Sequence, residues 1–152
     1  MSYAAGPSDG VPRNETKALE LWHRAGKLGH AESYYNIGIC YYQGNGMEVD
    51  KKKARHYYEL AAMRGHAGAR YNLGCIEGYA GNYDKAAKHF MIAARDGHGN
   101  AVKNIKGLYT NGHVTKDYYA KTLRARQEYL DEVKSDKRDK AAAAKTSYKY
   151  IE

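Results

Sequence analysis

Apolar residues recur along the chain at the spacing of one helical face. Between residues 50 and 64 they fall at intervals of three and four, and the segment 83–96 repeats the same order of small and bulky side chains. The two sets are Ala54, Tyr58, Ala61 and Ala62, then Ala86, Phe90, Ala93 and Ala94. This spacing favours amphipathic helices over strands, in which apolar and polar residues would alternate.

The chain is also internally repetitive over a longer distance. Three segments align without gaps: 25–38, 61–74 and 93–106. Their aligned histidines are His30, His66 and His98, at separations of 36 and then 32 residues. The bulky residues that align upstream are Trp22, Tyr58 and Phe90. A recurring offset of this size is typical of stacked repeats, so each unit predicts a first helix, helix A, and a second, helix B.

Glycine and aspartate mark the predicted helix ends. A glycine that can take the left-handed conformation precedes each aligned histidine: Gly29, Gly65 and Gly97. The loops 43–50 and 110–117 end in Asp50 and Asp117, either of which could accept hydrogen bonds from the next helix's first turn. Both prolines lie in the first 12 residues, so no proline interrupts the later helices.

We therefore predict an all-α fold of about seven helices. Their expected ranges are 14–28, 31–43, 50–64, 67–80, 83–96, 99–111 and 117–140. The repeat domain is expected over residues 10–140, as a truncated repeat 10–30, repeats 31–66 and 67–98, and a terminal repeat 99–134 with a helical extension. Residues 1–9 are expected to form a disordered tail and residues 141–152 a fraying one.

The joint pattern resembles the Sel1-like repeat, a relative of the tetratricopeptide repeat. Its parts are A-x-Y-N-L-G in helix A, a glycine loop ending in Asp, K-A and a bulky aromatic in helix B, and A-A-x-x-G-H at the turn. The resemblance covers about residues 10–134. It implies a right-handed α-solenoid of stacked antiparallel helix pairs that serves as a non-enzymatic scaffold or adaptor in protein–protein interactions.

The exposed face of helix A is the candidate binding surface, because the A helices line the inner side of a curved solenoid. One position of this face is asparagine in each unit: Asn36, Asn72 and Asn104. These amides either form a ladder that grips a peptide backbone or tie neighbouring helices together. The other candidate partner-binding residues are Tyr35, Tyr71, Lys103, Ile39 and Tyr42.

Two other functions remain open. The first predicted helix would have an apolar edge at Leu19 and Trp22, extended by Leu28, without an upstream partner, which favours a homo-oligomer such as a homodimer. The formal net charge of +8 allows a weakly basic RNA-associated protein. Because the excess is spread along the chain, no nucleic-acid groove is predicted.

No catalytic, cofactor or metal site is predicted. The sequence has no GxSxG, HExxH or phosphate-binding glycine loop. One histidine per repeat is too far from the next to share an ion, so the histidines are expected in turns or as N-caps. Cys40 and Cys75 are interpreted as small buried residues. With no long apolar stretch and no leader, a soluble cytoplasmic protein is expected.

Overall fold

The computed structural model describes the backbone of residues 13–151 and the side chains of residues 16–146. These residues form seven helices: α2 (Arg13–Lys27), α3 (Ala31–Gln43), α4 (Lys51–Met63), α5 (Ala67–Tyr79), α6 (Tyr83–Arg95), α7 (Gly99–Thr110) and α8 (Lys116–Ile151). The prediction of seven helices is confirmed, with ends that differ by one residue at most except at the end of α8. The tail predicted at residues 1–9 lies outside the described residues.

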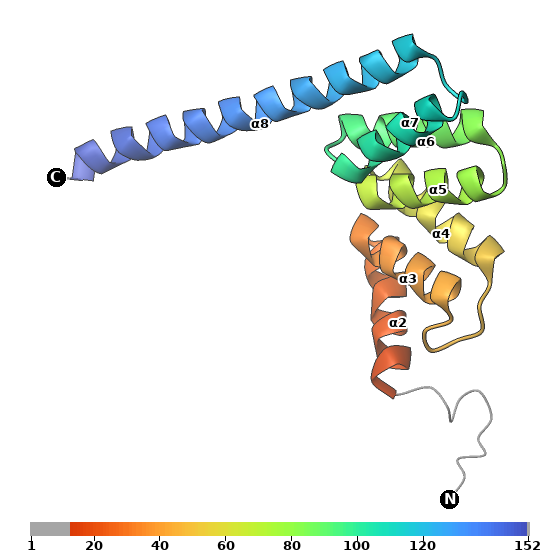
Figure 1. The fold of residues 1–152 in the computed structure, drawn as a ribbon. Coiled ribbons are helices and arrows are strands. Elements are labelled where there is room, and N and C mark those ends of the chain that lie inside the picture. Colours follow the sequence, from red (N-terminus) through yellow and green to blue (C-terminus); the bar gives the residue numbers. More distant parts are fainter. Residues whose placement is uncertain (1–12, 152) are drawn as a thin grey trace, which may run out of the picture.

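Successive helices pack against one another and build a stack (Figure 1). Helix α3 packs on α4 and α5 packs on α6, and each of these pairs is one repeat. Contacts of α4 with α5 and of α6 with α7 join the repeats, and α2 covers the first A helix, α3. The described part of the chain contains no strand. The architecture is therefore the predicted α-solenoid of antiparallel helix pairs.

The turns between repeats have the predicted geometry. The glycines before the aligned histidines have positive φ: 96° at Gly29, 87° at Gly65 and 105° at Gly97. Only glycine takes this conformation without strain, so the chain ends one helix and begins the next after three residues. The following histidine is the N-cap residue of α3, α5 and α7, which confirms the turn role expected of the histidines.

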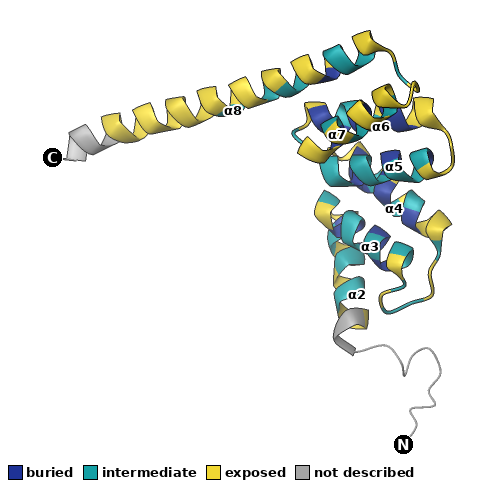
Figure 2. Ribbon diagram, in the orientation of Figure 1, coloured by how far each residue is buried: buried dark blue, intermediate teal, exposed yellow. Residues whose placement is uncertain are grey.

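The core is built by placing bulky rings over glycine in the neighbouring helix. The ring of Tyr58 on α4 lies over Gly38 on α3, and the ring of Phe90 on α6 lies over Gly74 on α5. Buried alanines make up much of the rest of both cores, together with Tyr34, Ile37, Leu73 and Ile105, so the backbones approach closely. Figure 2 shows these buried positions inside the stack. The repeated order of small and bulky residues in the sequence is thus the packing pattern of the fold.

Helix α8 closes the stack and then leaves it (Figure 1). Its first half contacts α6 and α7, where Thr122 is fully buried and the Arg126 guanidinium donates to the Gly97 carbonyl oxygen at 2.8 Å. All side chains from residue 134 to residue 146 are exposed (Figure 2). None of the described helices is long and apolar enough to cross a membrane.

The predicted end of the last helix was wrong. Helix α8 continues past residue 140 to Ile151, into the segment 141–152 that was predicted to fray. The described side chains of this segment, residues 141–146, are exposed, but the segment is rich in alanine and lysine and has neither glycine nor proline. The high helix propensity of alanine and lysine is enough to prolong a helix that tertiary contacts have already nucleated.

The two predicted aspartate caps had different outcomes. Asp50 is the N-cap of α4, and its carboxylate accepts from the Lys53 backbone N–H at 3.1 Å. Asp117 is not a cap, because α8 begins at Lys116 and the Thr115 hydroxyl accepts from the Tyr118 N–H at 3.1 Å. Threonine is also a good N-cap residue, and Asp117 instead lies in the first turn, with Lys121 at 3.2 Å.

Candidate functional site

A hollow of about 330 Å³ opens between the first two A helices, α3 and α5. Helix α3 contributes one wall and α5 the other, and Tyr58 of α4 also lines it. The lining residues are Tyr35, Ile39, Tyr42, Gln43, Tyr58, Asn72, Cys75, Ile76 and Tyr79. The hollow therefore lies on the helix-A surface that the sequence pointed to as the binding surface.

The walls of this hollow combine aromatic and aliphatic side chains with nearly as much polar surface. Four tyrosine rings and two isoleucines provide the apolar surface, and the amides of Gln43 and Asn72 provide hydrogen-bonding groups. No lining residue is an acid, a lysine, an arginine or a histidine. Apolar surface interspersed with polar groups is typical of a site that binds a side chain or a small molecule.

Two titratable groups in the hollow, Tyr58 and Cys75, stay protonated at physiological pH. Burial raises the pKa of Tyr58 to about 12, although its hydrogen bond with Asn72 acts in the opposite direction. Burial also raises the pKa of the Cys75 thiol. A thiol is a nucleophile only as thiolate, so Cys75 contributes shape and polarisability to the hollow and not reactivity.

The structure brings four of the eight predicted partner-binding residues together in this hollow. They are Tyr35, Ile39, Tyr42 and Asn72. Asn36 is half-buried on α3 and Lys103 is exposed on α7, and neither lines it. Tyr71 is half-buried on α5, where its ring stacks on His98 at 4.4 Å between centroids.

The repeated asparagines make contacts with neighbouring helices. The Asn104 amide nitrogen on α7 lies 3.3 Å from the Tyr71 hydroxyl and 3.9 Å from the Cys75 sulfur, both on α5. Asn72 on α5 is hydrogen-bonded to Tyr58 on α4. An amide side chain can make more than one hydrogen bond, because it has both donor and acceptor groups. These asparagines can therefore tie neighbouring helices together and still form a hydrogen bond with a ligand.

Sequence reasoning missed Gln43, Tyr58, Cys75, Ile76 and Tyr79 as lining residues. Cys75, which was expected to be buried, is only half-buried. Gln43 and Tyr79 hold the same position in their repeats, at the end of helix A, but they differ in type. A search for residues that recur in kind therefore passed over them. Tyr79 is 84% exposed, and exposure is not visible in the sequence.

A second repeated contact joins each helix A to the histidine of the next turn. The Tyr35 ring stacks on His66 with centroids 4.3 Å apart, and the Tyr71 ring stacks on His98. His66 also accepts from the Ala69 N–H at 2.9 Å through Nδ1, which leaves Nε2 to donate to the Glu32 carboxylate at 2.5 Å. These histidines fix the spacing of successive repeats.

The predicted oligomer edge is only partly exposed. Leu19 and Trp22 are half-buried and pack against the first core cluster. The exposed apolar side chains of this region are Leu21, at 53%, and Leu28, at 80%. Of the residues expected at this edge, only Leu28 is exposed, and Leu21 joins it as the apolar surface available to another molecule.

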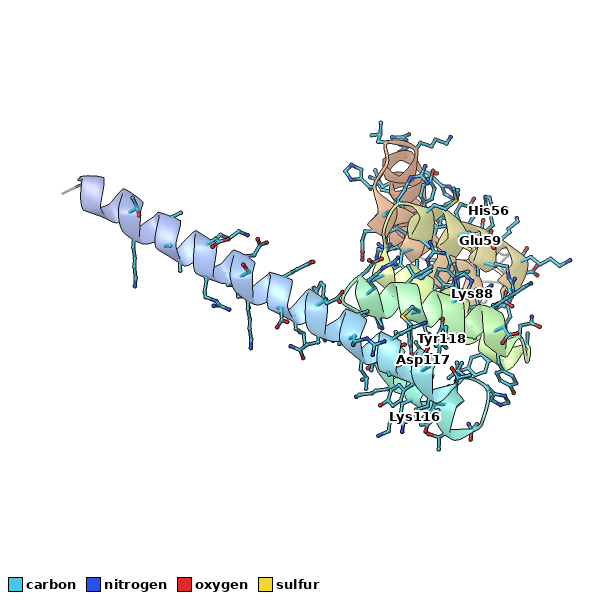
Figure 3. The ribbon with its side chains drawn as sticks, turned by 90° about the horizontal axis from the view of Figure 1, so that it is seen from above. His56, Glu59, Lys88, Lys116, Asp117 and Tyr118 are labelled. Atoms are coloured by element: carbon cyan, nitrogen blue, oxygen red, sulfur yellow. The ribbon has the colours of Figure 1, made fainter. Side chains whose placement is uncertain are left out.

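The outer surface of the B helices carries charges of both signs. Figure 3 shows His56 and Glu59 on α4, Lys88 on α6 and Lys116 and Asp117 at the start of α8, in order along one side of the stack. Mixed charges of this kind are typical of a solvated helix face. Among the described residues, no three His, Cys, Asp or Glu side chains are grouped so that they could hold a metal ion.

Comparison with known proteins found a family with matching repeats and solved structures with a similar fold. The sequence model of the Sel1 repeat matches residues 1–30, 31–66 and 67–98. A crystal structure of a Sel1 repeat protein from Oxalobacter formigenes is similar over 84% of this chain, with a TM-score of 0.63 and 27% identity. A protective antigen of uropathogenic Escherichia coli with an SLR fold is similar over 79%, with a TM-score of 0.63 and 20% identity.

This chain spans 52% of the first of these structures and 27% of the second. A search of curated proteins gave no match. The family match extends over more than half of the chain, and its units 31–66 and 67–98 each hold one helix A and one helix B. On these grounds the chain belongs to the Sel1 repeat family.

Proposed function

We propose that this protein is a non-enzymatic scaffold that binds a segment of a partner protein along its helix-A surface, with the hollow between α3 and α5 as the anchor point. Proteins of the Sel1 repeat family are generally protein-interaction scaffolds. The observation that carries the proposal for this chain is the hollow itself, which opens on the face where repeat proteins present their binding surface.

The size and lining of the hollow support a role in binding. A large apolar side chain has about 150–250 Å² of surface to bury. At about 25 cal/mol per Å², its burial would contribute roughly 4–6 kcal/mol before the costs of association are subtracted. Tyr79 is largely exposed without a partner and would be covered by one.

The chemistry of the lining supports binding rather than catalysis. The Cys75 thiol is the one cysteine nucleophile among the lining residues, and burial keeps it protonated. The lining has no aspartate, glutamate or histidine that could act as a general base. The amides of Gln43 and Asn72 can instead hydrogen-bond the backbone of an extended segment. On this proposal Asn104, on the adjacent helix A, continues the same row of amides.

Substitution of Tyr79 by alanine tests the binding surface. We expect Tyr79→Ala to reduce recovery of a specific partner about fivefold or more in a quantitative pull-down, because it removes an exposed wall of the hollow. Met63→Ala is the matched control, since Met63 is 77% exposed and does not line the hollow. The proposal fails if every protein recovered by the wild-type chain is recovered equally by Tyr79→Ala.

A homo-oligomer through α2 is a second candidate, which the exposure of Leu21 and Leu28 favours. If it forms, light scattering after size exclusion should show a dimer that dissociates on dilution and that Leu21→Asp with Leu28→Asp reduces to a monomer. Substitution of Trp22 would be a poor test, because Trp22 packs against the core. A wild-type chain that is monomeric at high concentration rules this candidate out.

A further inference from the structure

We infer that the segment held in the hollow between α3 and α5 is acidic: an extended stretch of another protein that inserts one bulky apolar side chain and places aspartate or glutamate beside it, facing Lys51. This inference rests on the proposed function and adds the chemical class of the partner. It follows from the position of one lysine at the rim and from the absence of carboxylates in the lining.

Lys51 stands at the rim of the hollow through its contact with Tyr42. Its ammonium nitrogen lies 5.1 Å from the centroid of the Tyr42 ring, and Tyr42 is part of the lining. Lys51 is exposed, and it makes no salt bridge with any described residue. A bound segment would therefore meet an ammonium group that has no carboxylate of its own.

Among the other charges near the hollow, the Asp50 carboxylate precedes Lys51 and accepts from the Lys53 backbone N–H, whereas the following groups favour an acidic segment. Asn104 on α7 lies against Cys75, a lining residue, and its neighbour in sequence, Lys103, is exposed. The nearest acid of α3, Glu32, is paired with His66. The whole chain carries a formal charge of +8. Approach of an acidic segment is favoured by this field, and approach of a basic one is opposed.

The volume of the hollow suits one large side chain. Liquid water occupies about 30 Å³ per molecule, so 330 Å³ corresponds to roughly eleven water molecules. A leucine, methionine or phenylalanine side chain fits this space, while the amides of Gln43 and Asn72 lie within the same lining for contact with the backbone on either side. A carboxylate one or two residues from the anchor would then reach the rim.

Selection from a random peptide library tests this inference. A phage library of twelve-residue peptides is selected on the full chain, and each enriched peptide is measured again on Tyr79→Ala. We expect peptides whose binding depends on Tyr79 to share one bulky apolar residue with Asp or Glu within three positions of it. Peptides that depend on Tyr79 but lack such acids overturn the inference and leave the proposed function intact. If no enriched peptide depends on Tyr79, both are overturned.

A matched pair of charge reversals isolates the role of Lys51. Lys53 lies in the same first turn of α4 and is equally exposed, but its ammonium group lies over Tyr41, which does not line the hollow. We expect Lys51→Glu to weaken binding of a synthetic selected peptide about three- to tenfold, and Lys53→Glu less than about twofold. The difference should shrink in 1 M salt. Equal effects of the two variants would mean that the peptide is attracted by the positive charge of the whole chain and not by Lys51, which would overturn the inference.

Discussion

Replacement of Phe90 by alanine should lower the free energy of unfolding by about 3–5 kcal/mol. Phe90 is 3% exposed and fills the space between α5 and α6 above the backbone of Gly74. Its loss leaves a cavity that buried alanines on the same helices cannot fill. Denaturant unfolding followed by circular dichroism measures the change. Tyr79→Ala, at an 84% exposed site, is the control and should change the free energy by less than about 0.5 kcal/mol.

The same pair of residues can be tested for direct coupling. A Cβ atom at Gly74 would lie 2.6 Å from a carbon of the Phe90 ring, so Gly74→Ala forces the buried ring to move. Overpacking of this kind costs about 1–3 kcal/mol, against a gain of about 1 kcal/mol from helix propensity. In the Phe90→Ala background the clash is absent. A double-mutant cycle should give a coupling of about 1 kcal/mol or more, and additive effects would contradict this packing.

Replacement of Glu77 by alanine should lower the free energy of unfolding by about 2–3 kcal/mol at pH 7. Glu77 is only 5% exposed, and its carboxylate accepts from Arg55 at 2.7 Å and from Asn82 at 2.8 Å. The variant loses two hydrogen bonds to a charged group. The loss of stability is smaller than for a fully buried ion pair, because the Arg55 side chain is 41% exposed and can be solvated by water in the variant.

The effect of Glu77 should depend on pH in a defined direction. The hydrogen bond from Asn82, with Arg55 and Lys85 nearby, lowers the pKa of this carboxyl against the opposing effect of burial. A lowered pKa gives stability that is fully present above the unfolded-state pKa of about 4.3 and is lost as pH falls through the folded-state pKa.

The difference between wild type and Glu77→Ala should therefore be constant from pH 6 to pH 7 and shrink below about pH 4. Glu59→Ala, an exposed acid on α4, is the control and should show a small difference throughout. A Glu77 effect that persists unchanged at pH 3 would mean that the carboxylate charge does not stabilise the fold.

Equivalent positions in the two central repeats have different chemistry. In the first, Tyr57 stacks on Tyr41 and Tyr34, with centroids 5.6 and 6.1 Å apart. One repeat later these three positions are His89, Glu77 and Arg70. Burial, and then Arg70, lower the pKa of His89, so this group remains neutral near pH 7. An aromatic cluster in one repeat is thus replaced by a polar one in the next, within the same backbone geometry.

Much of the fold could be predicted because it depends on local and repeated features. The spacing of alanine and aromatic residues defined the helices, and Gly29, Gly65 and Gly97 defined the turns, since only glycine takes their positive φ without strain. Two local errors, at Asp117 and at the end of α8, arose where competing residues had similar propensities. Thr115 caps as well as aspartate does, and an alanine-rich segment continues a helix as readily as it frays.

The candidate site could be predicted only in part. Recurrence in the sequence pointed to Tyr35, Ile39, Tyr42 and Asn72, which the structure brings into one hollow. It did not point to Tyr79 or Ile76, because a wall of the hollow needs only suitable shape and polarity and not the same residue in each repeat. Nor did it separate Leu21, which is exposed, from Trp22, which packs against the core.

The sequence by itself determined the helices, their turns and the order in which the repeats stack, because periodicity, glycine conformation and small-to-large packing act over a few residues or between adjacent helices. Only the tertiary structure decided which side chains share a surface, as at the hollow between α3 and α5 and at the pairing of Lys51 with Tyr42. Such sites depend on distances between side chains on different helices, which are fixed only when the helices pack.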